Sequence, residues 1–338
     1  MSCESIRFWS GPAAVLVNRE SFTQKVAIAV ATATVVSVRT PPGHHVENAL
    51  RPVALITGTS SGIGLAVAVK AARAGYRTVA TMRDTAKAGD LLEAAAEAGV
   101  RVDVRRLDVV DRDSVAAAVA GVVADHGGLD VVVNNAGQGH VGTVEVDSVE
   151  DFRRTMEVNF FGVLHVTKEA MPHLRANRGR LVTVTSVGGV VGQPFNEAYC
   201  AAKFAVEGMM ESLAPVAATQ GVRVVVVEPG AVGSNFLENV SVGSELENGS
   251  GEGWRDAAGA APMPYARALR SYLERSTVGL ARAQTPDEVA DHVLRVLSSD
   301  APPFRVQTSD AARRLVGLKL VDTDGAAVTG VTAQWLRW

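Results

Sequence analysis

This chain of 338 residues has few cysteines and few aromatic residues, and its positive and negative charges nearly balance. Its two cysteines, Cys3 and Cys200, lie far apart and form no Cys-x-x-Cys or Cys/His cluster. We therefore expect no metal site and no disulfide scaffold, and a reducing compartment fits. Aromatic residues make up 5% of the chain and the formal net charge is −3. Because stacking platforms and basic surfaces are both missing, we expect no nucleic-acid partner.

Long hydrophobic runs are missing as well. The longest uncharged apolar run, Val26–Val38, has 13 residues, fewer than the ~20 that span a bilayer. A charged lead of 25 residues precedes it, which is atypical of a signal peptide. We expect no membrane span and a cytoplasmic location. Residues 1–48 show no alternation of strands and helices; they are interpreted as a disordered extension or a wrongly chosen start, with an organelle-targeting segment as the alternative.

From Pro52 onward the chain alternates short Val- and Ile-rich runs with Ala-rich helical stretches. Continuous apolar runs of this kind are typical of strands covered on both faces of a parallel sheet. The expected strands are 53–57, 78–82, 102–107, 131–134, 180–185, 222–227 and 304–307, and the expected helices are 63–74, 86–98, 112–125, 149–176, 197–219 and 286–298. The alternation predicts an α/β fold with a Rossmann-type, doubly wound, parallel seven-stranded sheet in a three-layer sandwich.

A single domain, residues 49–310, is expected to hold this sheet, with a C-terminal tail, 311–338, packing on it. Residues 231–285 interrupt the alternation. Their first half is rich in Gly, Ser and Glu, and their second half holds a helical stretch at 265–280. Because a ~50-residue excursion inside a compact domain is usually functional, we interpret 231–285 as a substrate lid.

A glycine-rich turn follows the first expected strand and opens the first expected helix. Residues 57–64 read TGTSSGIG, with the spacing G-x-x-x-G-x-G. Glycine permits a sharp turn, a close approach to a pyrophosphate and tight helix–sheet packing, while the helix N-terminus presents N–H groups to phosphates. A structural turn can use the same residues, but the position between strand and helix favours a dinucleotide. The residues expected to bind it here are Gly58, Ser60, Ser61, Gly62, Ile63 and Gly64.

The end of the second expected strand bears on which dinucleotide binds. A carboxylate there would hydrogen-bond the ribose 2′-OH of NAD, but the strand ends at Thr81 and Met82, and Arg83 follows at once. A guanidinium suits a 2′-phosphate through bidentate pairing. Asp84 offers an alternative, a solvated surface pair with Arg83. We predict a preference for NADP(H) over NAD(H).

Two further turns at the ends of expected strands are candidates for cofactor contacts. After the third strand, Asp108 and Val109 are placed to meet the adenine amino group, unless the carboxylates there cap the next helix. After the fourth strand, the small residues Asn135, Ala136 and Gly137 would let the chain pass beside the adenine ribose, unless the segment is a plain turn.

Four polar residues form the candidate catalytic set. Tyr199 and Lys203 are four positions apart, so on a helix they share one face, with Cβ atoms ~6 Å apart. A free Tyr titrates near ~10, and a nearby ammonium is expected to lower the pKa of the phenol. Ser186 ends the fifth expected strand, where its hydroxyl can donate to a carbonyl oxygen. Asn159, inside the expected helix 149–176, is either a solvated or back-bonding residue or the holder of a water that relays protons to Lys203.

In this order, the motifs resemble those of the short-chain dehydrogenase/reductase family over about residues 52–310. Residues 57–64 match the family's cofactor loop and 134–137 its strand-4 motif. Its catalytic tetrad is matched by Asn159, Ser186, Tyr199 and Lys203. The resemblance implies that the turn after the sixth strand passes the nicotinamide. The residues of that turn are Pro229, Gly230 and Val232.

A narrower resemblance, to the 17β-hydroxysteroid and retinol dehydrogenase branch of the family, rests on residues 79–84, 186–203 and 304–320. It implies a bulky apolar carbonyl or alcohol as the substrate. Pocket residues are expected beside the motifs at the carboxyl ends of strands. Besides Ser186 they are Gln138, His140, Val141, Gln193, Phe195 and Phe236. For His140, a solvent-facing loop position is an open alternative.

Together these features predict an NADP(H)-dependent oxidoreductase that interconverts a carbonyl and a secondary alcohol by hydride transfer, in the direction of reduction. Tyr199 is expected to donate the proton, Ser186 to hold the oxygen and Lys203 to bind the nicotinamide ribose. The alternatives are a non-catalytic nucleotide sensor on the same fold and NAD-dependent alcohol oxidation. By the family likeness, the helices 149–176 and 197–219 are expected to pair with a second subunit in a homodimer or homotetramer.

Overall fold

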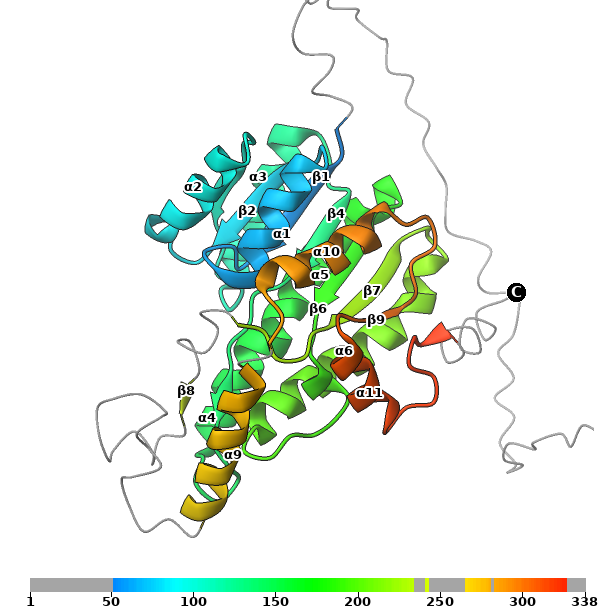
Figure 1. The fold of residues 1–338 in the computed structure, drawn as a ribbon. Coiled ribbons are helices and arrows are strands. Elements are labelled where there is room, and N and C mark those ends of the chain that lie inside the picture. Colours follow the sequence, from blue (N-terminus) through cyan, green and yellow to red (C-terminus); the bar gives the residue numbers. More distant parts are fainter. Residues whose placement is uncertain (1–50, 234–240, 243–264, 281–282, 327–338) are drawn as a thin grey trace, which may run out of the picture. The chain divides into compact units, whose positions relative to one another are not determined.

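The structure, a computed structural model, describes residues 51–233, 241–242, 265–280 and 283–326, all of which belong to one compact unit. Figure 1 shows this part of the chain as coloured ribbon. The expected extension at residues 1–48 and the expected pocket residue Phe236 lie outside the described residues, as does most of the expected lid.

Seven strands of the described chain form one parallel sheet in the order β3-β2-β1-β4-β6-β7-β9. They are β1 (Val53–Thr57), β2 (Arg77–Met82), β3 (Asp103–Arg106), β4 (Val131–Asn134), β6 (Arg180–Val184), β7 (Arg223–Glu228) and β9 (Arg305–Gln307). The prediction of a doubly wound seven-stranded sheet is confirmed. Strand order reverses between β1 and β4, and in such sheets ligands bind beyond the carboxyl ends of the strands at that point.

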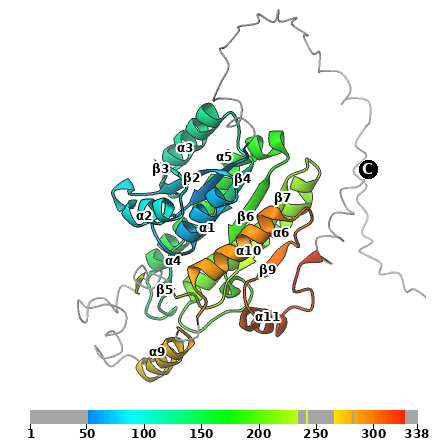
Figure 2. The same ribbon diagram turned by 45° about the horizontal axis from the view of Figure 1, so that its top comes forward.

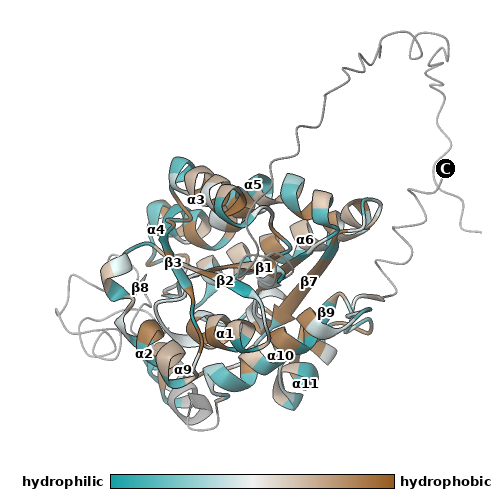
Figure 3. Cartoon of the chain, turned by 90° about the horizontal axis from the view of Figure 1, so that it is seen from above, coloured by the Kyte–Doolittle hydropathy of each residue, from teal (hydrophilic) through white to brown (hydrophobic). Residues whose placement is uncertain are grey.

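Helices cover both faces of the sheet, as Figures 2 and 3 show from two further directions. They are α1 (Gly62–Arg73), α2 (Gly89–Glu97), α3 (Arg112–His126), α4 (Val149–Met156), α5 (Gly162–Asn177), α6 (Glu197–Ala218), α9 (Ala266–Leu280), α10 (Pro286–Ser298) and α11 (Asp310–Gly317). One core joins the sheet to α3, α5 and α6, and a second core joins it to α1, α2 and α10. The result is the expected three-layer sandwich.

Alternation of side chains along each strand explains why the strands are apolar throughout. In β1, Leu55 enters the core shared with α3, α5 and α6, while Ala54 and Ile56 enter the core shared with α1, α2 and α10. All three are fully buried. A strand with helices on both faces has no polar side, so a continuous Val/Ile/Leu run is what the position requires.

The expected helix 149–176 is present without a gap, as α4 and α5 joined by a π turn, but its middle does not have the α-helical geometry that was expected. Residues Glu157–Phe161 form a π turn between α4 and α5, in which the N–H of Gly162 donates to the carbonyl of Glu157. The hydrogen bond therefore spans five residues and not four. Turns of this kind insert one extra residue into a helix and often occur at functional sites.

Two smaller assemblies flank the sheet near the carboxyl ends of its strands. Strand β5 (His140–Val141) pairs in parallel with β8 (Ser241–Val242), and Val141 packs with Leu269 and Leu273 of α9. At another edge, Ala312 and Val316 of α11 pack on a cluster that includes Val187 and Val190. Among the described residues, no helix is both long and apolar enough to cross a bilayer.

Candidate active site

The glycine turn after β1 has a geometry that only glycine allows. Gly58 and Gly62 have φ angles of +69° and +59°. A Cβ on Gly58 would lie 2.8 Å from the Cα of Ala136, and a Cβ on Gly64 would lie 2.2 Å from the carbonyl oxygen of Gly58. Both distances are shorter than any real Cβ contact. The turn is thus packed tightly against the segment that follows β4.

The N-terminus of α1 lacks both a side-chain cap and an acidic first turn, whereas α2 and α6, which also lack a side-chain cap, have an acidic residue in the first turn. The N-cap of α1, Ser61, makes no side-chain hydrogen bond, and its first turn holds no acidic residue. By contrast, α3 and α10 have side-chain caps, Asp111 and Thr285, and acidic residues in the first turn. The first N–H groups of α1 and the positive end of its dipole are therefore available to an anion such as a phosphate.

Hydrogen bonds join the turns after β1 and β4 into one platform. The hydroxyl of Thr57 accepts from the N–H groups of Asn135 and Ala136, both at 3.0 Å. The side-chain amide of Asn135 donates to the carbonyls of Thr57 and Gly58, at 2.9 and 3.0 Å. The segment 134–137 is therefore more than a plain turn, because its side chains hold the glycine turn in place.

Arg83 follows β2 at the same edge of the sheet as the glycine turn, since Thr57 and Thr81 are paired in the β1–β2 register. It is exposed and forms no ion pair with any residue that the structure describes. Asp84 accepts a hydrogen bond from the N–H of Ala86 at 3.0 Å and caps the short helix after it. The alternative of an Arg83–Asp84 surface pair is therefore wrong.

In the turn after β3, the structure shows which carboxylate caps the next helix and which one does not. Asp111 caps α3 by accepting from the N–H groups of Asp113 and Ser114. Asp108 is not the cap; its carboxylate accepts only from the N–H of Val110, at 3.2 Å, among described residues. Val109 packs against Gly162, where an added Cβ would meet it at 2.8 Å. Asp108 thus keeps acceptor capacity at the carboxyl edge of the sheet.

Ser186 and Tyr199 are brought together at the end of β6. The N–H of Gly188 donates to the Ser186 hydroxyl at 2.9 Å, and the Ser186 and Tyr199 hydroxyls share a hydrogen bond. Burial raises the pKa of Tyr199 to about 12, an effect that the hydrogen bond from Ser186 only partly opposes. The predicted lowering of this pKa is therefore wrong for the protein without a bound ligand, because burial of the phenol outweighs the hydrogen bond from Ser186.

Lys203 lies one helical turn after Tyr199 on α6. Its side chain is 5% exposed. The ammonium donates to the carbonyl of Val184 at 3.3 Å and lies 5.7 Å from the centroid of the Tyr199 ring. Burial lowers the pKa of Lys203 to about 8, and the charge of Glu207 opposes this effect. The group stays largely protonated at neutral pH.

Asn159 occupies the π turn and is fully buried. Its amide N–H group donates to the carbonyls of Gln138 and Thr155, at 2.8 and 3.1 Å, and its oxygen accepts from the N–H of Gln138 at 3.1 Å. A solvated Asn159 is therefore ruled out, whereas the bond to Thr155, four residues earlier, is the back-bonding that the sequence left open. The Cβ position of Gly137 lies 3.0 Å from the Asn159 oxygen and 3.5 Å from the Lys203 nitrogen. The structure thus brings the Asn159 amide and the Lys203 ammonium close together beside Gly137.

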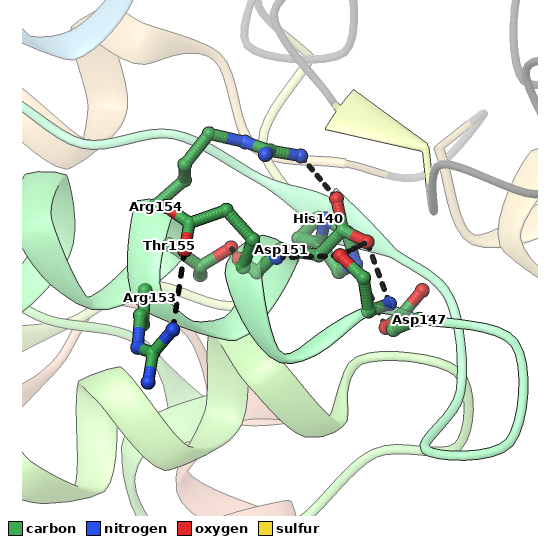
Figure 4. Close-up of polar contacts among 8 residues, drawn as sticks. His140, Asp147, Asp151, Arg153, Arg154 and Thr155 are labelled. Carbon is green, nitrogen blue, oxygen red and sulfur yellow. Dashed lines mark hydrogen bonds and ion pairs between the residues drawn. The ribbon is translucent and has the colours of Figure 1, made fainter.

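His140 is 2% exposed, so the solvent-facing alternative is wrong. Its Nε2 lies 2.9 Å from the carboxylate of Asp147, which is itself buried. Figure 4 shows this pair beside the start of α4, where Asp151 contacts Arg154. The neighbouring Val141 packs against Leu269 and Leu273 of α9.

Residues of the two loops beside Tyr199 meet α9. The rings of Phe195 and Tyr272 lie 5.6 Å apart between centroids, and Asn196 donates to the Tyr272 hydroxyl at 2.6 Å. Phe195 has a φ of +58°, a strained conformation for a bulky residue. Gln193 is half-buried, and its N–H donates to the sulfur of Cys200 at 3.4 Å.

The turn after β7 also reaches this site. The carbonyl of Pro229 accepts from the N–H of Val187, directly after Ser186, at 2.9 Å. Gly230 follows, and Val232 forms a parallel bridge with Gln284. Among the residues that the sequence did not single out are Tyr272 on α9 and Glu207 on α6. A charged residue one turn after Lys203 on an apolar helix was the available signal for Glu207.

The family model described as "short chain dehydrogenase" matches residues 52–244. Over 282 residues the chain is 36% identical to estradiol 17-beta-dehydrogenase 1 of Rattus norvegicus, covering 81% of this chain and 78% of the relative. It is 38% identical to retinol dehydrogenase 8 of Bos taurus over 288 residues, covering 80% and 86%.

Two solved structures resemble this chain in fold. Actinorhodin polyketide ketoreductase with NADPH has a TM-score of 0.62 at 28% identity, covering 77% of this chain and 96% of that one. A short chain dehydrogenase/reductase from Burkholderia phymatum in complex with NAD has a TM-score of 0.66 at 25% identity, covering 79% and 92%.

Proposed function

The chain belongs to the short-chain dehydrogenase family, and on that premise we propose that it reduces a bulky apolar ketone or aldehyde with NADPH. Membership makes it an oxidoreductase acting on CH–OH groups with a nicotinamide dinucleotide. The choice of NADP(H), the apolar substrate and the direction are the proposal. The observation that carries it is the meeting of Ser186, Tyr199 and Lys203 at the edge of the sheet that holds the glycine turn.

That edge is shared because the strands are parallel and adjacent. Thr57, Asn134 and Thr183 occupy β1, β4 and β6, and the register pairs Asn134 with Thr183. The glycine turn follows β1 directly, while Ser186 lies just past the end of β6. A dinucleotide on the turn would therefore extend across β4 toward Ser186 and Tyr199, as in other sheets of this topology.

The residues present fit such a cofactor. The N-terminus of α1 behind the glycine turn suits a pyrophosphate, since its N-cap makes no side-chain hydrogen bond and its first turn holds no acidic residue. Arg83 is free to pair with a 2′-phosphate. Tyr199 and Lys203 would hold the nicotinamide ribose. When bound, the nicotinamide supplies the hydride that the protein itself lacks.

The side chains supply the proton and hold the oxygen. With a pKa of about 12, Tyr199 is a neutral phenol at pH 7 and carries the proton that carbonyl reduction requires. Ser186 holds the carbonyl oxygen through its hydroxyl, and the Lys203 ammonium stabilises negative charge as the Tyr199 proton leaves. Lys203 then passes a proton back to the Tyr199 phenolate, and a water positioned by Asn159 restores the proton of Lys203.

An apolar substrate is supported by the walls beside this site. Val141, Leu269 and Leu273 form a buried cluster with partly buried Phe195 and Tyr272. The cluster joins the loops after β4 and before α6 to α9 of the proposed lid. The names of the relatives, an estradiol and a retinol dehydrogenase, agree with a large apolar substrate class.

NADPH consumption with a panel of carbonyl compounds tests the proposal. The panel contains a 17-ketosteroid, retinal, a quinone and a short polar ketone, and each is assayed with NADPH and with NADH. We expect turnover of the bulky apolar compounds with NADPH, abolished in Tyr199→Phe. Turnover that survives in Tyr199→Phe, or a preference for NADH, would contradict the proposed chemistry or cofactor.

We also propose a homodimer or homotetramer in the cytoplasm. Exposed apolar side chains lie on the π turn and on α6, where Phe161, Phe204 and Val216 are 37%, 36% and 52% exposed. Burial of these groups against a second copy would remove apolar surface from water. Light scattering of the purified chain measures the assembly directly.

A further inference from the structure

A group of buried charged residues lies beside the segment that carries Ser186 and beside Lys203. The proposed reaction does not use this group. Glu207 on α6, Glu228 at the end of β7 and Arg305 on β9 are 4%, 0% and 6% exposed. Charges are almost never buried unless they are paired. Here one guanidinium faces both carboxylates, at 2.5 Å from Glu207 and 2.8 Å from Glu228.

Glu207 connects this group to the segment that presents Ser186. The hydroxyl of Thr185, the residue before Ser186, donates to one carboxylate oxygen of Glu207 at 2.5 Å. The other oxygen accepts from Arg305. On the far side of Ser186, the Cβ position of Gly189 lies 2.9 Å from the Cγ of Glu207. The Glu207 side chain therefore contacts the chain on both sides of Ser186.

Glu207 also lies one helical turn after Lys203. Positions four apart share a helix face, and the negative charge of Glu207 opposes the effect of burial on the Lys203 ammonium. Burial and the charge of Glu228 raise the pKa of Glu207, while Arg305 and Thr185 lower it. Ionisation of Glu207 thus adds negative charge beside Lys203 in the pH range where Lys203 would lose its proton.

Arg305 also contacts a third carboxylate. Its second nitrogen lies 3.4 Å from Glu211, the outermost carboxylate, which is 29% exposed. Gln307 donates to Glu228 at 2.9 Å. The charged groups facing Glu207 are then Lys203 on its own helix, Glu228 from β7 and Arg305 from β9.

We propose that Glu207 is a positioning residue for the proposed reaction. It fixes the segment Thr185–Gly189 that presents Ser186, and from one helical turn away its carboxylate stabilises the ammonium of Lys203. This inference rests on the proposed function. A buried ion pair is poor evidence for stability, because apolar residues of similar volume often serve a core as well or better. Two carboxylates share one guanidinium, and one of them also binds Thr185 and lies one helical turn from Lys203, which fits a role in the site.

Three variants separate the two parts of this role. Thr185→Val removes the hydroxyl that joins Ser186 to Glu207 and keeps the charge. Glu207→Gln keeps the size and removes the charge. Glu211→Gln is the matched control, since Glu211 contacts Arg305 from the same helix but lies at the exposed rim. The readouts are kcat and KM across pH 6–10, and the Kd for NADPH from its fluorescence.

For Thr185→Val we expect kcat to fall roughly 10-fold or more, because small displacements of a reacting group are costly, with the alkaline limb of the pH profile unchanged. For Glu207→Gln we expect the alkaline limb to move down by about one pH unit. The Kd for NADPH should stay within about twofold, and Glu211→Gln should match the wild type. A Thr185→Val kcat within twofold of the wild type, or an unmoved alkaline limb in Glu207→Gln, overturns the proposal.

A measurement on the cofactor-free protein keeps this test separate from the proposed function. Because the pKa of Glu207 is raised in the folded state, the native protein binds more protons than the unfolded chain above the unfolded pKa. The free energy of unfolding therefore falls as pH rises through that window. Glu207→Gln should flatten this fall and Glu211→Gln should keep it; equal slopes in all three proteins count against the inference. If the wild type reduces no carbonyl compound, the proposed function fails while this slope still reports on Glu207.

Discussion

Replacing Lys203 by Met should make the cofactor-free protein more stable while it removes the proposed activity. The ammonium is buried, and its pKa falls from 10.5 to about 8 in the folded protein. At ~1.4 kcal/mol per pH unit, this difference corresponds to about 3 kcal/mol of destabilisation at pH 7. Methionine keeps the apolar stem and removes the charge.

Part of this gain is offset, because the ammonium donates to the carbonyl of Val184 at 3.3 Å. A hydrogen bond of this kind contributes about 1 kcal/mol. We therefore expect Lys203→Met to raise the free energy of unfolding by about 2 kcal/mol at pH 7.

The pH dependence gives the sign of the effect. Between pH 8 and 10.5 the folded protein binds fewer protons at Lys203 than the unfolded chain, so wild-type stability rises with pH in this window. By pH 9.5 the remaining cost of burying the group is about 1.4 kcal/mol, so the advantage of Lys203→Met should shrink by about 2 kcal/mol and nearly vanish.

Urea denaturation of both proteins at pH 7 and pH 9.5, followed by circular dichroism, measures these differences. Lys87→Met is the control, since Lys87 is exposed and its replacement should change stability by less than about 0.5 kcal/mol. A Lys203→Met variant that is less stable than the wild type at pH 7, or whose stability difference does not vary with pH, would refute the reasoning.

Three other outcomes follow from the site. Tyr199→Phe should lower kcat by ~10²- to 10⁴-fold with little change in the Kd for NADPH, measured by steady-state kinetics and fluorescence titration. Arg83→Ala should raise the KM for NADPH by about 10- to 100-fold, as expected for loss of a charged hydrogen bond, and should leave the KM for NADH unchanged. Replacement of the exposed Arg101 by Ala is the control, and equal effects of Arg83→Ala on both cofactors would contradict the role of Arg83. Gly64→Ala should abolish NADPH binding because its Cβ would meet a carbonyl at 2.2 Å, whereas Gly89→Ala, with open space around its Cβ, should bind normally in the same calorimetric titration.

The fold followed from the sequence because the central strands β1, β4, β6 and β7 are buried on both faces, and such strands are visible as Val-rich runs. The π turn at residues 157–161 did not, because one extra residue shifts the phase of the apolar pattern without ending the helix. For the same reason the burial of Asn159 was not expected.

The candidate site was only partly predictable. The residues that meet were identified from motif order, but the pKa of Tyr199 depends on burial, which spacing along a helix does not reveal. Glu207 and Arg305 lie 98 positions apart, and a contact between residues so far apart in one sequence leaves no local pattern.

Because of the π turn between α4 and α5, the site depends on the number of residues encoded in this stretch of the chain. Because the chain there has one residue more than an ordinary helix, the direction of Asn159 depends on how many residues separate Thr155 from Gly162 and not on which they are. Deleting a single codon would rewind the helix and swing Asn159 by ~100° about its axis, away from Gln138. A scan by point substitution would overlook this dependence, whereas insertions and deletions would reveal it.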